Sequence, residues 1–270
     1  MDRTERPPQD PELRRRITDL IACKGGGHNP DLVTDVIENA LKLLKDVEHR
    51  GDVKVIQTAV RELRYAFRLF APYAATRKVS IFGSARLKPE GVEYQQAVET
   101  GRLLADAGFM IITGAGPGIM QAGHEGAGVE RSFGANIRLP WEQSANPVIA
   151  EDKKLVTFKY FFTRKLTFLR HSDAIVLFPG GFGTMDELFE ILTLRQTRKA
   201  SHVPIVLMDE GYWRSVINLD QFIEYGMIDA ADLTLFRFAD TAETAWDALL
   251  EQGLGAAHDT DDDEDLARDM

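Results

Sequence analysis

The chain has 270 residues, of which 44% are hydrophobic, 27% charged and 9% aromatic, the balance of an ordinary soluble globular protein. This composition excludes fibrous and wholly disordered chains. The net charge of −10 argues against nucleic-acid polymers as partners, because phosphate backbones require a basic surface. The single cysteine, Cys23, cannot form an intramolecular disulfide, so we expect a cytoplasmic protein.

The two ends of the chain differ in composition from the rest. Residues 1–11 contain three prolines and mixed charges without an apolar run, which predicts a disordered arm and no signal peptide. Residues 255–270 hold a dense run of acidic residues, which predicts a disordered acidic tail. No segment approaches the roughly 20 apolar residues that cross a bilayer, so we expect no membrane partner.

Residues 12–76 are predicted to form a helical extension, because apolar residues recur at helical spacing and no strand pattern interrupts them. Two or three helices are expected, with a break at residues 24–31. The three glycines of that break could hold a phosphate, but no strand precedes them, so a flexible turn is the favoured interpretation.

Residues 77–254 alternate short β-branched runs with helical patterns, which predicts an α/β fold, a Rossmann-like doubly wound parallel sheet. The predicted strands are 78–82, 109–113, 135–139, 174–178 and 204–208. The predicted helices are 91–107, 117–129, 158–171, 184–199, 211–225 and 241–252. Because ligands of such sheets bind beyond the carboxyl ends of the strands, we looked for chemistry at these ends.

The first strand end carries the sequence GSAR, in which Gly83 permits a sharp turn. Ser84 offers a hydroxyl and Arg86 a cation suited to phosphate or carboxylate. A tight turn with a solvent-facing arginine explains the same residues equally well.

The second strand end contains Gly114, Gly116 and Gly118 at the start of a helix, a pattern that offers backbone N–H groups to an anion. It is not the dinucleotide motif G-x-G-x-x-G, because Ile119 stands three residues after Gly116. We therefore do not predict NAD. No metal is expected either: His124 has no second histidine at helical spacing, and we interpret it as a surface residue or a hydrogen-bonded helix residue.

The fourth predicted strand leads into PGGFGTMDE, the most informative segment of the chain. Gly180, Gly181 and Gly183 expose amides, Thr184 adds a hydroxyl and Glu187 follows in the helix. Thr184 and Glu187 also fit a T-x-x-E capping box, which needs no ligand. Three clustered glycines exceed what capping requires, so a phosphate site with a carboxylate beside it is favoured.

The helix before this strand contains Arg164 and Lys165 in an aromatic setting. We expect four phenylalanines to form the core face of this helix: Phe158, Phe161, Phe162 and Phe168. The two cations could complete an anionic pocket at the carboxyl edge of the sheet.

These motifs resemble the LOG (Lonely Guy) family of cytokinin riboside 5′-monophosphate phosphoribohydrolases. PGGFGTMDE matches the family motif P-G-G-x-G-T-x-x-E, and TRK matches its Arg-Lys pair. GSAR, GAGPGIM and LPWEQ follow the family order, so the resemblance covers about residues 77–210.

The resemblance implies a Rossmann-like catalytic domain in a homodimer or larger homo-oligomer. It implies hydrolysis of the N-glycosidic bond of adenosine-type 5′-monophosphates, an AMP nucleosidase-like reaction, without metal or redox cofactor. Arg164 and Glu187 would be the catalytic pair. The residues that would bind the substrate are Gly181, Gly183, Thr184, Lys165, Thr193 and, in LPWEQ, Glu142.

The helical extension and the acidic tail place the chain with longer bacterial members, so AMP, N6-modified AMP or both are expected substrates. The alternative is a non-catalytic carrier of a nucleotide or of molybdenum cofactor. Relatives have also been labelled lysine decarboxylases, but such an enzyme needs a Schiff-base lysine for pyridoxal phosphate, and no lysine here is singled out for that role.

Overall fold

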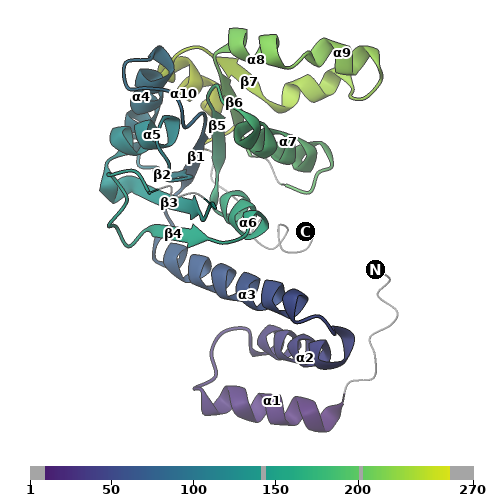
Figure 1. Ribbon diagram of the computed structural model, residues 1–270. Helices are drawn as coiled ribbons and strands as arrows, with labels where there is room; N and C mark the ends of the chain where they lie inside the picture. Colours follow the sequence, from purple (N-terminus) through teal and green to yellow (C-terminus); the bar gives the residue numbers. More distant parts are fainter. Residues whose placement is uncertain (1–9, 141–143, 201–202, 256–270) are drawn as a thin grey trace. The chain divides into compact units, whose positions relative to one another are not determined.

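The computed structural model describes residues 10–140, 144–200 and 203–255, and it divides the chain into two units, Met1–Val60 and Arg61–Met270. The larger unit contains a seven-stranded parallel sheet of order β4-β3-β2-β1-β5-β6-β7 (Figure 1). The strands are β1 Lys78–Phe82, β2 Met110–Thr113, β3 Ser132–Ile137, β4 Leu155–Phe158, β5 Ala174–Leu177, β6 Ile205–Met208 and β7 Arg237–Ala239. The α/β doubly wound prediction is confirmed.

Helices cover both faces of this sheet. They are α4 Val92–Asp106, α5 Ile119–Ala127, α6 Phe161–His171, α7 Phe182–Gln196, α8 Glu210–Val216, α9 Leu219–Glu224 and α10 Ala242–Glu251. Successive strand residues point to opposite faces, so Ile81 packs in the cluster that also contains α4, α5 and α10, whereas Phe82 packs in the cluster of α6 and α7. The sheet therefore separates two hydrophobic cores.

The five predicted strands are all present, with bounds within three residues of the expected ones, but β4 and β7 were not predicted. Both are short edge strands.

The prediction of a helix over 158–171 was wrong at its start, because Phe158 ends β4 and pairs with Ile137. The predicted core face was wrong for Phe161 and Phe162, which are each 52% exposed, and right for Phe168. The segment 211–225 forms two helices, because Asn218 starts a new one by accepting a hydrogen bond from the Gln221 amide.

The strand order reverses between β1 and β5, since β1 to β4 extend the sheet in one direction and β5 to β7 extend it in the other. In a doubly wound sheet the connections from such neighbours go to opposite faces, which leaves a crevice at the carboxyl ends of the two strands. This is the position at which a ligand is expected.

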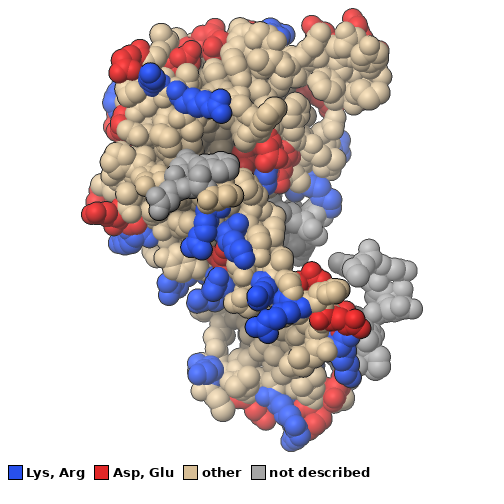
Figure 2. Space-filling model, in the orientation of Figure 1, with Lys and Arg blue, Asp and Glu red and all other residues tan. Residues whose placement is uncertain are grey.

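Acidic and basic side chains are interspersed over the face that Figure 2 shows. No helix among the described residues is both long and apolar enough to cross a membrane.

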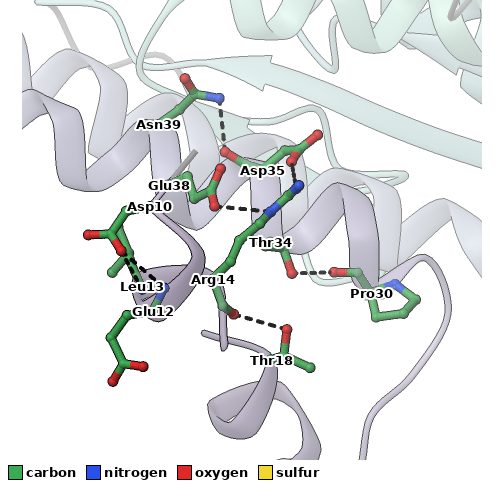
Figure 3. Close-up of polar contacts among 10 residues, drawn as sticks. All are labelled: Asp10, Glu12, Leu13, Arg14, Thr18, Pro30, Thr34, Asp35, Glu38 and Asn39. Atoms are coloured by element: carbon green, nitrogen blue, oxygen red, sulfur yellow. Dashed lines mark hydrogen bonds and ion pairs between the residues drawn. The ribbon is translucent and has the colours of Figure 1, made fainter. Parts of the chain in front are cut away.

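The smaller unit contains α1 (Pro11–Cys23), α2 (Pro30–Asp46) and the first part of α3 (Arg50–Phe70), so the helical prediction is confirmed. Asp10 caps α1 by accepting hydrogen bonds from two backbone amides. Arg14 joins α1 to α2 through ion pairs with Asp35 at 2.5 Å and Glu38 at 3.1 Å (Figure 3). These groups are partly exposed, so each pair contributes little to stability.

The second part of α3 belongs to the larger unit. Ala66 and Phe70 are buried, and the Phe70 ring stacks on Phe133 of β3 with 4.3 Å between centroids and on His171 at 4.0 Å. The end of α3 is thus part of the core of the α/β unit.

Candidate active site

A cavity of about 1210 Å³ opens at the carboxyl edge of the sheet, where the strand order reverses. Its volume is sufficient for a ligand the size of a nucleotide. Most of the residues predicted from the sequence line it: Gly83, Ser84, Gly114, Arg164, Gly180, Gly181, Gly183, Thr184 and Glu187. Arg86 lines it as well.

Ser84 joins the three glycine loops. Its amide donates to the carbonyl of Pro179 at 2.9 Å, and its carbonyl accepts from the Ile119 amide at 3.1 Å. The loops approach so closely that two positions require glycine. A Cβ at Gly180 would lie 2.1 Å from Oγ1 of Thr184, and one at Gly118 would lie 2.3 Å from the Ser84 carbonyl oxygen. The glycines therefore bring the loops together as well as exposing backbone.

Helix α7 begins at Phe182 and points its first turn at the cavity. Its N-cap is Gly181, so Thr184 lies inside the helix and the capping-box interpretation of Thr184 and Glu187 was wrong. The first N–H groups of a helix have no partner within the helix. A Cβ at Gly183 would meet open space among the described residues, which leaves room for an anion beside these amides.

Arg164 extends from α6 across the second glycine loop. Its Nε donates to the Ala135 carbonyl at 2.9 Å, and a Cβ at Gly114 would lie 2.4 Å from its Nη2. Burial lowers the pKa of the Arg164 guanidinium, and the nearby carboxylate of Glu187 partly opposes this shift. Arg164 is therefore a partly buried, oriented cation at the cavity wall.

Glu187 lies on α7 with its side chain 11% exposed. Burial raises the pKa of its carboxyl group to about 7, although the positive charges of Lys165 and Arg164 act in the opposite direction. A carboxyl group that titrates near neutral pH, close to an arginine in a cavity, is a candidate for acid-base or electrostatic catalysis.

Lys165 and Thr193 do not line this cavity. They contribute to a shallower depression on the outer side of α7. Lys165 Nζ lies 2.5 Å from Glu190 and 3.0 Å from Asp186, but 3.7 Å from Glu187. Its charge is largely used to join α6 to α7, while the Thr193 hydroxyl donates to the Phe189 carbonyl.

Gly116 and Gly118 hold the second glycine loop in place and are not part of the cavity wall. The Asn146 side-chain amide donates to the Gly116 carbonyl at 3.0 Å and lies 3.2 Å from Nδ1 of His124. The ring Nε2 of His124 lies 3.0 Å from the Phe133 carbonyl. His124 is fully buried, so its interpretation as a hydrogen-bonded helix residue is confirmed.

Glu142 lies outside the described residues.

Within residues 10–140, 144–200 and 203–255, no cluster of His, Cys, Asp or Glu side chains could hold a metal ion.

Three parts of the cavity wall were not predicted. Asn136 near the end of β3 is 8% exposed and lines the cavity. Tyr212 of α8 lines it too, and its hydroxyl donates to the Gly180 carbonyl. The strand-end rule, applied to 135–139 and 204–208, could have found both. The third part is an apolar wall of Val216, Ile217, Phe222, Tyr225 and Met227, for which the sequence offered no local signal.

The family model described as possible lysine decarboxylase matches residues 114–249, just over half of the chain. The chain is similar to the probable cytokinin riboside 5′-monophosphate phosphoribohydrolase LOG4 of Oryza sativa subsp. japonica, with 27% identity over 173 residues, 62% of this chain and 73% of that protein. It is 28% identical over 174 residues to the cytokinin riboside 5′-monophosphate phosphoribohydrolase LOG3 of Arabidopsis thaliana. The match covers 62% of this chain and 79% of that protein.

Among solved structures, a Moco carrier protein from Chlamydomonas reinhardtii matches 66% of this chain and 97% of its own, with 19% identity and a TM-score of 0.46. The family match extends from the second glycine loop to α10 and includes the α7 motif and the Arg164 helix. The chain therefore belongs to the LOG family, whose family model is described as possible lysine decarboxylase.

Proposed function

We propose that the protein hydrolyses the N-glycosidic bond of adenosine-type nucleoside 5′-monophosphates, either AMP, N6-modified AMP or both, to free base and ribose 5-phosphate. One observation carries the proposal. A single cavity combines the N-terminus of α7 with a partly buried carboxyl group, Glu187, and a partly buried cation, Arg164. The names of the curated relatives support the same activity.

The phosphate would bind at the first turn of α7. The backbone amides of Phe182 and Gly183, the hydroxyl of Thr184 and the positive end of the helix dipole all favour an anion. Binding energy from the phosphate, which does not react, would then fix the ribose against Glu187.

The bond that breaks joins C1′ of the ribose to the base nitrogen, and positive charge develops on the ribose as it does. The Glu187 carboxylate would stabilise this oxocarbenium-like state and orient the ribose hydroxyls or the attacking water. The oxygen of the water forms the new bond to C1′, and one proton of the water is transferred to the nitrogen of the departing base.

Arg164 would contact the nucleotide or steady the departing base. Its Nε is engaged by the Ala135 carbonyl, so the other guanidinium nitrogens are left to face the cavity. The base would lie toward the wall formed by α8 and α9, where Val216, Ile217 and Phe222 provide apolar surface.

Decarboxylase chemistry with pyridoxal phosphate does not fit the residues present. A Schiff base requires a lysine in the cavity, and among the described residues that line it there is none. Lys165 lies outside that lining and pairs with carboxylates of α7. We derive no step through that cofactor.

We also propose a homodimer, as the family resemblance implies. Phe182 is 96% exposed and Phe161 is 52% exposed, and both lie at the cavity. Association of two copies through these rings would remove apolar surface from water. Light scattering after gel filtration measures the mass. A monomer at all concentrations would contradict the dimer without affecting the proposed reaction.

The activity is tested by incubating the purified protein with AMP and with isopentenyladenosine 5′-monophosphate and separating the products by chromatography. Free base from either supports the hydrolase. Glu187→Gln should abolish release while still binding ribose 5-phosphate. If neither these nucleotides nor a wider panel yields base, although the panel binds, the protein is a carrier and the proposal fails.

A further inference from the structure

Glu62, in the second part of α3, reaches the helix that carries the catalytic arginine. Its Oε1 accepts a hydrogen bond from the Lys159 amide at 2.7 Å, and its Oε2 accepts one from the Thr163 hydroxyl at 2.7 Å. These residues lie about a hundred positions further along the chain. Glu62 is 9% exposed and Thr163 is fully buried, so the contact is shielded from water.

This carboxylate anchors the start of α6 through the Lys159 amide, which precedes the helix, and through the Thr163 hydroxyl. Helix α6 starts at Phe161, and its N-cap, Tyr160, makes no side-chain capping hydrogen bond within the described part of the chain. The first turn of such a helix has orphan N–H groups and a partial positive charge, both of which favour a carboxylate. Glu62 satisfies the amide just before the helix and the hydroxyl of its third residue.

Arg164 belongs to the turn that Glu62 anchors. Thr163 directly precedes Arg164, and the Arg164 amide donates to the Tyr160 carbonyl in this same turn. At its other end the Arg164 side chain is fixed by the Ala135 carbonyl. The backbone of Arg164 is thus held from α3, while its guanidinium is held from β3.

We propose that Glu62 is a positioning residue for catalysis: by holding the start of α6 from α3, it sets the place of Arg164 near Glu187. The expected effect on kcat rests on the proposed function. The contact of Glu62 with α6 does not depend on that function. The proposal assigns a positioning role to the end of α3, a segment that precedes the glycine loops and was expected to lie outside the catalytic domain.

Two variants remove the contact in different ways. Glu62→Ala deletes both acceptors. Thr163→Val keeps the shape of the buried side chain but loses its hydroxyl, which also lies 2.9 Å from the Tyr160 carbonyl, so it tests the same link together with that local contact. Glu62→Gln restores an acceptor for the Lys159 amide and serves as the conservative rescue. Arg64→Ala, at an exposed position on the same helix, is the matched control.

The first experiment measures two quantities separately: kcat with AMP as substrate, and the dissociation constant of ribose 5-phosphate. The phosphate site lies on α7, so Glu62→Ala should bind ribose 5-phosphate within about 3-fold of wild type. Its kcat should fall about 10- to 100-fold, because displacement of a catalytic group by about 1 Å has an effect of this size. Thr163→Val should lose less, Glu62→Gln should recover most of the rate, and Arg64→Ala should match wild type.

The second measurement does not require turnover. Amide hydrogen exchange should increase in Glu62→Ala within residues 159–165 and remain unchanged in the strands. If wild type releases no base from any nucleotide, the proposed function fails and this exchange pattern alone decides the inference. An unchanged kcat in both Glu62→Ala and Thr163→Val overturns it. So does exchange that rises uniformly over the unit, since that would mean Glu62 only stabilises the fold.

Discussion

The hydroxyl of Tyr212 donates a hydrogen bond to the carbonyl oxygen of Gly180, which ties the helix after β6 to the glycine loop after β5. Gly180 in turn lies against Ser84 and Thr184, because a Cβ there would meet both. The orientation of the amides at the start of α7 therefore depends on a residue of a different strand-helix connection.

Tyr212→Phe should weaken phosphate binding without altering the fold. The ring still packs, but the Gly180 loop loses one hydrogen bond, which contributes about 0.5 to 1.5 kcal/mol. We expect the dissociation constant of ribose 5-phosphate to rise about 3- to 10-fold by calorimetry. Tyr65→Phe, at an exposed phenol on α3, is the control. Equal affinity in the two variants would contradict this role of Tyr212.

Gly114→Ala should displace Arg164. The added methyl group would lie 2.4 Å from Nη2 of Arg164 and 2.8 Å from the Met120 sulfur, and both are ends of flexible side chains, so the side chains move and the fold survives. We expect kcat to fall about 100-fold, with a melting temperature near that of wild type. Gly51→Ala, which meets open space among the described residues, should be fully active. Wild-type kcat in Gly114→Ala would mean that Arg164 is not catalytic.

The sheet and the phosphate loop were predictable because their signals are local. Buried parallel strands such as β5 read as uninterrupted apolar runs, and Gly180 to Gly183 follow one of them directly. Glu187 was identified by motif, but its raised pKa depends on burial that no local pattern displays. The link from Glu62 to Lys159 and the apolar wall at Phe222 join distant segments, so only the folded structure reveals them. Thr184 was ambiguous between helix cap and phosphate ligand, and the helix start at Phe182 excludes the cap.

The pH dependence of catalysis should follow Glu187. Its pKa of about 7 means that in the free enzyme the carboxylate is lost as pH falls through 7. In the proposed mechanism the ionised form stabilises the transition state, so kcat/KM should decline about tenfold per pH unit below 7 and level off above it. Initial rates from pH 5 to 9 measure this. A flat profile would show that Glu187 does not act as the ionised group.

Glu190→Gln should shift the pH at which kcat/KM begins to decline. The negative charge of Glu190 raises the pKa of Glu187, and Glu190 also pairs with Lys165 at 2.5 Å. Its removal deletes a repulsion and frees the cation to favour the Glu187 carboxylate. The midpoint of the kcat/KM profile should therefore shift to lower pH, while Glu210→Gln, a distant exposed pair with Arg214, leaves it in place. A midpoint that rises would contradict this electrostatic account.

His124 should make the protein less stable in mild acid. Burial lowers its pKa from 6.5 to about 4, so between these values the unfolded chain binds a proton that the folded chain does not. The free energy of unfolding therefore falls as pH falls from 6.5 toward 4, by about 2 kcal/mol between pH 7.5 and 5 from this group alone. Urea unfolding of wild type and His124→Gln at both pH values isolates the contribution. The variant should lose about 2 kcal/mol less than wild type over this range. Equal losses would mean that the folded state binds the His124 proton as readily as the unfolded chain does, which the burial of the ring opposes.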